Sequence, residues 1–375
     1  MCNNLIRRDF NISLLYYGNS APKYAIDQSV YIINNLERFN HTIKTLSDFK
    51  PEVILGMSSG FRSIYFLKIS RALNVPFCLH ESTHFLRFCG ENWARPRKIS
   101  FFEAALEREI ICAQAYCIRH VLDHSIKSFP SYILPQLTIF PNPINFKHNK
   151  RNAFRNKTII NVGGLKKVKN IFPLLDAFRK IHIKYPEWNV KIIGDGFSSE
   201  QNYKKTIFDY VEKNNLGDKV SFKGNIKNIE EEYSSSSIHV ITSLDENFSM
   251  CTVEAMAFGI PTIGFTNSYG VSTLVDDGET GILVDVNNDI SGLQEALEKL
   301  ITDHEYWDYL SINAYNNVNN FSPDRIYDLW ENVFLRSKHY HTDDGLLLNE
   351  QMAVDRDRAL FSRKKAYDII ESYSE

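Results

Sequence analysis

The stretch DENFSMCTVEAMAFGIPT, residues 245–262, decides the fold of this chain and raises the question of its function. Its middle part, 250–258, has the apolar composition of a buried helix and carries a single charge, Glu254, before a Gly and a Pro close it. A second carboxylate, Glu246, stands just before the helix. Because an apolar run lies on either side, the stretch predicts a helix between two buried strands.

The same alternation of strand and helix patterns continues outward in both directions. One helix is expected around 171–181, with Pro173 tolerated in its first turn. Nearly continuous apolar strands separated by helices predict parallel sheets covered on both faces, which is the α/β class. The expected strands are 12–17, 52–56, 74–80, 137–142, 157–164, 188–194, 219–224, 238–243, 261–265 and 281–285.

The length of the chain predicts more than one domain, because 375 residues exceed what one core usually serves. The segment 139–157 combines prolines, asparagines and a basic run, and we interpret it as the linker. We expect a first domain over 1–150, a second over 151–321, and helices with a polar tail over 322–375. A return of this last segment to the first domain stays open. The run SSSS at 234–237 is expected at a helix surface or helix end.

The composition of the chain limits the kinds of molecule that it binds and the compartment in which it is expected. The net charge of -2 gives no field that would attract nucleic acid. The first residues lack the apolar core of a signal peptide, and no apolar run approaches the length of a membrane span, so a cytoplasmic location is expected. The segment 84–108 mixes basic and aromatic residues. A helix with a solvated face is the favoured interpretation, and peripheral attachment to the inner face of a membrane is the alternative.

The cysteines are interpreted as structural. The chain has 6 Cys without a C-x-x-C pair, which argues against a zinc site or a disulfide framework. Free thiols of this kind indicate a reducing compartment. Apolar neighbours predict burial for Cys78, Cys112, Cys117 and Cys251.

The start of the helix in the opening stretch suits a phosphate group. The first turn of a helix offers unpaired N–H groups and a partial positive charge. Glu254 lies one turn deeper on the same face and could accept the hydroxyl protons of a ribose, while Glu246 could accept those of a second hydroxylated group. The alternative is that Glu254 is only a helix residue at the edge of a core, since two Glu at this spacing often occur by chance. The amides would come from 247–251.

Two further segments are candidates for phosphate binding. In NVGGLKKVKN, 161–170, glycines let a backbone approach a ligand and lysines neutralise a diphosphate. A solvated basic turn explains the same residues equally well when they are taken alone. In IIGDGFSSE, 192–200, a G-x-G follows a strand but lacks the third Gly of a dinucleotide site, which favours a turn shaped by two glycines.

Together these segments resemble the retaining glycosyltransferases of family four, which have the GT-B fold, over 158–335. The second domain carries the family motifs in order. The first three are Val162-Gly163-Gly164-Leu165-x3-Lys169-Asn170 for V-G-R-L-x3-K-G, Gly194 and Gly196 for I-G-x-G, and Val220, Phe222 and Gly224 for V-x-F-x-G. The fourth, E-G-F-x5-E-A-M-A-x-G-x-P, is matched by Glu246, Phe248, Glu254, Ala255, Met256, Ala257, Gly259 and Pro261. The fifth, G-V/P…V-x-D-G-x-x-G-x-L-V, is matched by Gly270, Val275, Asp277, Gly278, Gly281, Leu283 and Val284. In the first domain KPEVILG and Asn74-Val75-Pro76…Leu79-His80 are similar to family strands.

The resemblance implies two Rossmann-like domains whose parallel sheets face each other across a cleft. It implies transfer of a sugar from a nucleotide-sugar, with a UDP-sugar first among the donors, and with retained anomeric configuration. The acceptor would be a glycan or a lipid-linked glycan in bacterial surface polysaccharide synthesis. No metal and no separate cofactor would be required, because the leaving diphosphate itself takes the acceptor proton while cations and amides stabilise its charge.

The resemblance also implies roles for individual residues. Catalysis would rest on His80, Lys169 and Glu246, with Lys169 at the diphosphate and Glu246 at the donor sugar. Without the family, a lone His at a strand end such as His80 is more often structural. Glu254 would hold the ribose. The remaining binding residues would be Gly163, Gly164, Lys166 and Gly194 around the phosphates, Gly224, Asn225 and Ile226 at the base, and the amides of Phe248, Ser249, Met250 and Cys251.

Three departures from the family pattern keep other functions open. Gly164 replaces the Arg of V-G-R-L, Asn247 replaces a Gly, and the short segment before Pro51 predicts a shortened first domain. These departures favour a non-catalytic GT-B-like partner subunit or a sugar-nucleotide-binding module as the first alternative. A metal-dependent GT-A transferase would have to use Asp355-Arg356-Asp357, in the polar tail, and an epimerase would share the GT-B fold.

Overall fold

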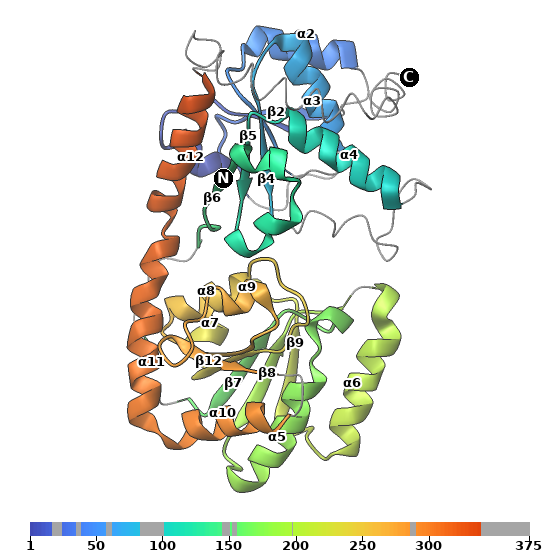
Figure 1. Cartoon of the computed structure of the whole chain (residues 1–375). Coiled ribbons are helices and arrows are strands. Elements are labelled where there is room, and N and C mark those ends of the chain that lie inside the picture. The colour runs from blue at the N-terminus through green and yellow to red at the C-terminus, as the bar shows by residue number, and fades with distance from the viewer. Residues whose placement is uncertain are drawn as a thin grey trace. The chain divides into compact units, whose positions relative to one another are not determined.

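The computed structural model describes residues 1–16, 25–34, 39–57, 62–82, 101–144, 151, 156–196, 198–285 and 290–338. It divides the chain into two compact units (Figure 1). Unit 1 is Met1–Pro141 together with Pro323–Glu375, and unit 2 is Asn142–Ser322. The chain therefore leaves unit 1 at Pro141 and returns to it at Pro323.

Unit 2 is built on a fully parallel sheet with the strand order β12-β11-β10-β7-β8-β9. Consecutive strands run outward from β7 on one side and outward from β10 on the other. The order therefore reverses between β7 and β10, where the loops of an α/β sheet part and leave room for a ligand. All six strands were expected: β7 Thr158–Val162, β8 Asn189–Ile193, β9 Val220–Gly224, β10 Ile238–Ile241, β11 Thr262–Phe265 and β12 Gly281–Val284.

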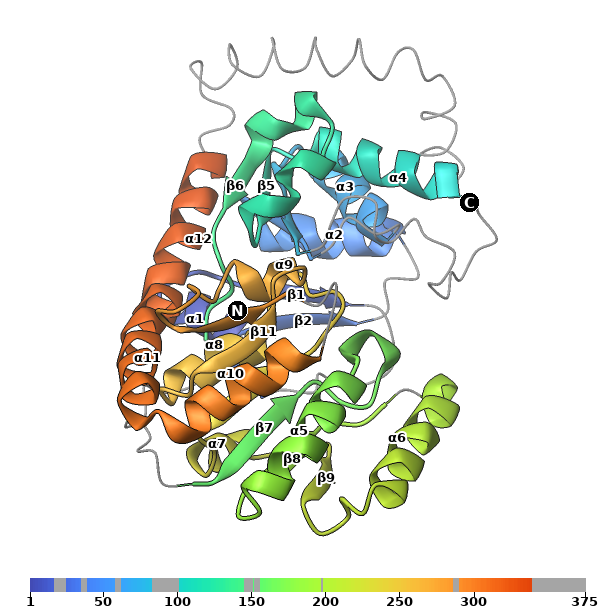
Figure 2. The same ribbon diagram turned by 60° about the horizontal axis from the view of Figure 1, so that its bottom comes forward.

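Helices cover both faces of this sheet. Figures 1 and 2 show α5 (Phe172–Lys184) and α10 (Ser291–Thr302) on one face and α8 (Met250–Ala257) on the other. Right-handed crossovers place α5, between β7 and β8, and α8, between β10 and β11, on opposite faces, because the two halves of the sheet are wound in opposite directions. The other helices of unit 2 are α6 Gln201–Lys213, α7 Ile229–Ser234, α9 Tyr269–Ser272, α11 His304–Asn317 and the 3₁₀ turns Lys167–Lys169, Ser198–Glu200 and Val318–Phe321.

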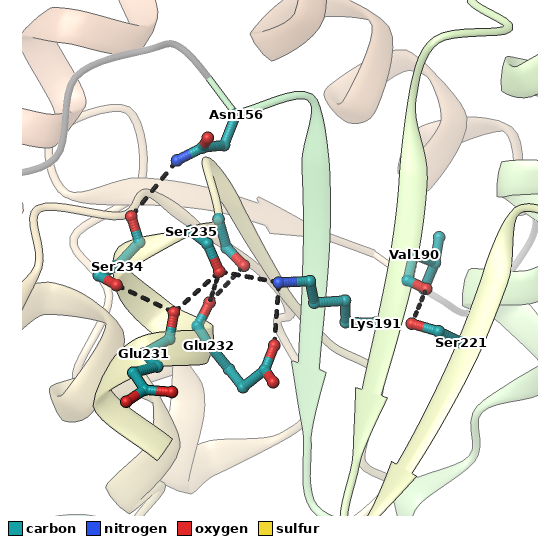
Figure 3. A network of polar contacts seen from close by, with 9 residues as sticks. Asn156, Val190, Lys191, Ser221, Glu231, Glu232, Ser234 and Ser235 are labelled. Atoms are coloured by element: carbon teal, nitrogen blue, oxygen red, sulfur yellow. Dashed lines mark hydrogen bonds and ion pairs between the residues drawn. The ribbon is translucent and has the colours of Figure 1, made fainter. Parts of the chain in front are cut away.

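The periodicity of α5 is confirmed, since its apolar stripe packs into the main core of unit 2 around Trp188 and Trp307 and Pro173 lies in its first turn. The serine run is confirmed as a helix end. Lys191 on β8 contacts Glu232 Oε2 at 2.9 Å and donates to Ser235 Oγ at 2.8 Å, while Asn156 Nδ2 donates to the Ser234 carbonyl (Figure 3). These bonds close the last turn of α7 against the sheet.

Unit 1 contains a parallel sheet of order β3-β4-β5-β6 and a separate parallel pair β1-β2. The strands are β1 Ser13–Tyr16, β2 Tyr31–Asn34, β3 Ile54–Gly56, β4 Phe77–Glu81, β5 Cys117–His120 and β6 Leu137–Ile139. The helices are α1 Cys2–Ile6, α2 Phe39–Phe49, α3 Arg62–Leu73, α4 Phe101–Gln114, α12 Pro323–Lys338 and the 3₁₀ turns Asp123–Ser128 and Ser131–Gln136.

Strands β2 and β5 were missed by the sequence analysis. The sequence of β5 is CIRH, and its Arg119 and His120 interrupt the apolar run that marks a buried strand, although both are buried in the structure. The thiols of Cys78, Cys112 and Cys251 are buried as expected, but Cys117 is only partly buried. Cys89 and residues 84–100 lie outside the described residues, so the basic and aromatic segment is not described except where α4 begins.

None of the helices in the described ranges has both the length and the apolar composition that crossing a membrane requires.

Candidate functional site

The candidate site lies in unit 2, at the carboxyl ends of β7 and β10. The loop after β7 contains Gly163, Gly164 and the lysines, and the loop after β10 contains Glu246 and leads into α8. These two strands are neighbours in the sheet and flank the point where the strand order reverses. The fold therefore brings two segments about 80 residues apart in sequence to one ligand-binding position.

Glycines shape the loop after β7. Gly164 has a φ of +82°, and a Cβ there would overlap the carbonyl oxygen of Asp195. Gly194 has a φ of +101°, and its Cβ would lie 2.8 Å from the Gly164 nitrogen. The amides of Gly163 and Gly164 both donate to the Ile193 carbonyl, at 3.1 and 3.0 Å. These glycines thus let two loops approach each other, and the arginine of the family motif could not occupy position 164 without moving the backbone.

Lys169 is held over this glycine turn. A Cβ on Gly163 would lie 3.0 Å from Lys169 Cδ, so the aliphatic part of the lysine covers the glycine. The Lys169 carbonyl accepts a hydrogen bond from Thr242 Oγ1 at 3.2 Å, and the Val168 carbonyl accepts one from the Leu244 amide at 2.9 Å. Both bonds tie the lysine loop to the end of β10.

Lys169 and Glu246 form an ion pair between the two loops. Their side chains are 19% and 13% exposed, so the pair is partly shielded from water. The Glu246 carbonyl accepts from the Gly270 amide at 3.0 Å, and the Gly270 carbonyl accepts from the Ser249 amide at 3.2 Å. A side chain at Gly270 would overlap the Glu246 carbonyl, so this glycine permits the close approach of α9 that fixes the loop.

The start of α8 offers backbone donors. The Ser249 carbonyl accepts from the amides of Thr252 and Val253, at 3.1 and 3.3 Å. Among the described residues, the amides of Met250 and Cys251 donate to no backbone carbonyl. The side chains of Phe248, Ser249 and Cys251 are buried, and burial raises the pKa of the Cys251 thiol to about 12. This segment therefore has main-chain N–H groups to offer an anion, and its thiol is no nucleophile.

Glu254 has a partner that the sequence analysis missed. Its Oε2 accepts a hydrogen bond from the Tyr233 hydroxyl at 2.9 Å. On α8 only Met250 and Glu254 are not buried, which confirms that they share a face one turn apart. Burial raises the pKa of Glu254, and the Tyr233 hydrogen bond opposes that rise. Tyr233 lies in the last turn of α7, a helix rich in glutamate, and nothing in its local sequence connects it with α8.

The segment expected at the base lies farther from the switch point. Gly224 ends β9 with a φ of +59°, and its carbonyl accepts from the Gly194 amide at 2.7 Å. Asn225 Oδ1 accepts from the Asp195 amide at 3.2 Å, and Ile226 is partly buried. The Lys166 amide donates to the Gly164 carbonyl at 3.1 Å.

His80 belongs to unit 1, where it lies on β4 and is partly buried. Its Nδ1 is 2.9 Å from Arg119 Nη1, and its ring lies 6.0 Å from that of Trp330. Burial lowers the pKa of His80 to about 4, and the charge of Arg119 adds to the effect. The structure thus brings Lys169 and Glu246 together in unit 2, and it gives His80 a separate set of partners in unit 1.

Within the described ranges, no group of three or more His, Cys, Asp or Glu side chains could hold a metal ion. The Asp355-Arg356-Asp357 sequence lies outside those ranges.

Comparison with known proteins shows which families and folds the chain resembles. Residues 144–317 match the model of the family described as glycosyl transferases group 1. A Haemophilus influenzae protein named as an uncharacterized glycosyltransferase is 25% identical over 347 residues, which cover 89% of this chain and 93% of the relative. The amylovoran biosynthesis glycosyltransferase AmsD of Erwinia amylovora is 23% identical over 348 residues, which cover 88% of this chain and 92% of the relative.

Solved structures of other proteins share the fold of this chain. HepE of Anabaena, solved in complex with UDP and glucose, superposes with a TM-score of 0.72 at 16% identity and covers 88% of this chain and 94% of its own. Sucrose-phosphate synthase of Thermosynechococcus elongatus gives 0.66 at 18% identity, over 89% and 92%. The chain therefore has the GT-B fold, which confirms the expected α/β class with parallel sheets. Residues 144–317 are similar to the glycosyl transferases group 1, and the relatives that resemble the chain over most of its length are named as glycosyltransferases.

Proposed function

We propose that the protein is a retaining glycosyltransferase that transfers a sugar from a UDP-sugar to a glycan or lipid-linked acceptor in bacterial surface polysaccharide synthesis. The observation that carries the proposal is the Lys169–Glu246 ion pair at the switch point of the sheet, next to the two backbone amides that open α8. A cation, amides and a carboxylate at one place suit a diphosphate joined to a hydroxylated ring.

In this proposal Lys169 and the amides of Met250 and Cys251 bind the diphosphate and stabilise the charge that develops as it leaves. Glu246 accepts hydrogen bonds from the donor sugar. Glu254 accepts hydrogen bonds from the ribose, and its ionised form is the better acceptor. The departing diphosphate oxygen takes the proton of the acceptor hydroxyl on the same face of the sugar, so that the anomeric configuration is retained and no protein nucleophile is needed.

The choice of UDP and of the acceptor class is supported by the relatives. HepE was solved with UDP and glucose, and AmsD is named for amylovoran biosynthesis. A poly(glycerol-phosphate) alpha-glucosyltransferase of Bacillus subtilis is 27% identical over 216 residues, 57% of this chain. The roles of Gly163, Gly164, Lys166 and Gly194 at the phosphates, and of Gly224, Asn225 and Ile226 at the base, are part of the same proposal.

The first experiment is a screen for the donor. A ligand that binds only the folded state raises the melting temperature, so UDP-, GDP- and ADP-sugars are compared by thermal shift. The donor that stabilises is then incubated with membrane lipid extracts and glycan acceptors in the presence and absence of EDTA, and the product anomer is read by NMR. The proposal expects a UDP-sugar, an EDTA-resistant reaction and a product with the anomeric configuration of the donor.

Each part of the proposal has a result that would contradict it. Binding of a UDP-sugar without hydrolysis or transfer would favour the partner-subunit alternative, and an inverted anomer would refute retention. Loss of activity in EDTA would restore the metal-dependent alternative.

A further inference from the structure

The side chains of His80 and Arg119 are neighbours because of strand register in unit 1. In the parallel pair β4 and β5, His80 is the partner of Arg119, so both side chains leave the sheet on the same face. Arg119 is 1% exposed, and its guanidinium lies 4.7 Å from the centre of the Phe140 ring and 5.7 Å from that of Trp330. A guanidinium packed between two aromatic rings is held in one place.

The contact between these two side chains has only one chemical interpretation. Arg119 Nη1 and His80 Nδ1 are 2.9 Å apart. A guanidinium has five donors and no acceptor, so the imidazole nitrogen that faces it has to accept. That nitrogen therefore carries no proton, and the proton of a neutral imidazole stays on the other nitrogen, Nε2.

The other charged neighbours do not reverse this assignment. Glu81 follows His80 on β4, but it forms an ion pair of 2.9 Å with Arg108, and both of those side chains are buried. His120 follows Arg119 on β5, and its Nδ1 lies 2.9 Å from the Leu122 carbonyl. Tyr327 of α12 is the further titratable group near Arg119, and burial raises its pKa. A second proton on the partly buried His80 would thus place a cation in contact with the buried guanidinium of Arg119, which a low-dielectric environment disfavours.

We propose that Arg119 is a positioning residue that holds His80 as the neutral Nε2–H tautomer, so that His80 meets a ligand only as a hydrogen-bond donor. The role of His80 toward a ligand rests on the proposed function, whereas the tautomer rests on unit 1 alone. A donor of this kind serves a sugar hydroxyl or a phosphate oxygen. It cannot take the proton of the acceptor hydroxyl, which agrees with a reaction in which the leaving diphosphate takes that proton.

The tautomer is read directly by nitrogen NMR of the full chain labelled with ¹⁵N-histidine, at neutral pH. His80→Asn identifies the resonance by its disappearance. The proposal expects an unprotonated Nδ1 and a protonated Nε2 in the wild type and in Arg119→Lys, since lysine is also only a donor. Arg119→Met keeps much of the volume and removes the donor, and the resonance should then report a mixture of tautomers. A protonated Nδ1 or an imidazolium in the wild type would overturn the assignment.

Kinetics then separate positioning from folding. Arg119→Met should lower kcat about tenfold, the loss equivalent to one hydrogen bond, while KM for the UDP-sugar changes less than about twofold. Arg119→Lys should recover most of the rate. Equal kcat in Arg119→Met and wild type, at equal folded fraction by circular dichroism, would overturn the positioning role. If the wild type turns over no nucleotide-sugar at all, the proposed function fails, and the nitrogen resonances still decide the tautomer.

Discussion

The Lys169–Glu246 ion pair predicts that one substitution has opposite effects on the affinity for UDP and on the rate of transfer from the UDP-sugar. In the structure the two charges neutralise each other, so a diphosphate meets a lysine that is already paired. Glu246→Gln removes the negative charge and keeps the shape. We expect UDP to bind more tightly to this variant, whereas transfer from the UDP-sugar becomes slower, because the hydrogen bond from the donor sugar to a carboxylate is weakened.

The size of the effect follows from the exposure of the pair. Its side chains are 19% and 13% exposed, which places it between exposed pairs, worth about 0.2 to 1 kcal/mol, and buried ones, whose rupture costs about 3 to 5 kcal/mol. Taking about 1 to 2 kcal/mol as released to the diphosphate, the Kd of UDP should fall about 5- to 30-fold. A charge-assisted hydrogen bond to the sugar is worth about 1.5 to 3 kcal/mol, so kcat/KM should fall about 10- to 150-fold.

The assay is isothermal titration with UDP, combined with initial rates of transfer. The matched control is Glu187→Gln, which removes one partner of the 3.0 Å ion pair between Lys157 and Glu187. Lys157 precedes β7 and Glu187 precedes β8, so both lie at the amino ends of the strands, opposite to the candidate site, and their side chains are exposed. The control should leave both quantities unchanged. Weaker UDP binding by Glu246→Gln, or an unchanged Kd with an unchanged rate, would refute the reasoning. The gain for UDP should also shrink at high salt.

Three further predictions concern the same unit. Gly164→Ala should destabilise the fold by about 2 to 4 kcal/mol in urea unfolding, because the φ of Gly164 is +82° and the new Cβ overlaps the Asp195 carbonyl. Gly217→Ala, whose new Cβ has no atom within 4 Å, should not destabilise the fold, and equal urea midpoints for the two variants would contradict the strain argument. Tyr233→Phe removes the hydrogen bond that lowers the pKa of Glu254, so this pKa should rise and the loss of UDP affinity on acidification should begin at a higher pH than in the wild type. Identical pH profiles of the UDP Kd in the two proteins would exclude Glu254 as the residue that accepts the ribose hydroxyls. Burial lowers the pKa of His239 to about 3, so between the ordinary pKa near 6.5 and about 3 the unfolded chain binds a proton at this residue and the folded chain does not, and the free energy of unfolding should fall by about 1.4 kcal/mol per pH unit. His239→Gln should remove this part of the pH dependence in acid unfolding, and an unchanged slope would mean that His239 is not neutral when folded.

The sequence by itself determined the six strands of unit 2 and two of its helices, α5 and α8, and it predicted the loops in which the candidate site lies. Short runs rich in aliphatic and β-branched residues mark the six strands, and the helix pattern at 250–258 predicts α8 with Met250 and Glu254 on one face. These features are local, because side-chain periodicity follows directly from backbone geometry. In unit 1 the same reasoning missed β5, because Arg119 and His120 are polar residues whose burial depends on partners elsewhere in the chain.

Only the tertiary structure decided which of these residues meet. Lys169 and Glu246 are 77 positions apart, Glu254 and Tyr233 are 21 apart, and His80 and Arg119 are 39 apart. Each pair depends on strand order, on register or on the packing of a helix, which are set by the burial of the whole core and by loop approaches such as that of Gly164 to Asp195. A motif therefore identifies the residue types of a site, whereas the charge, the tautomer and the protonation of each side chain are set by neighbours that are distant in sequence.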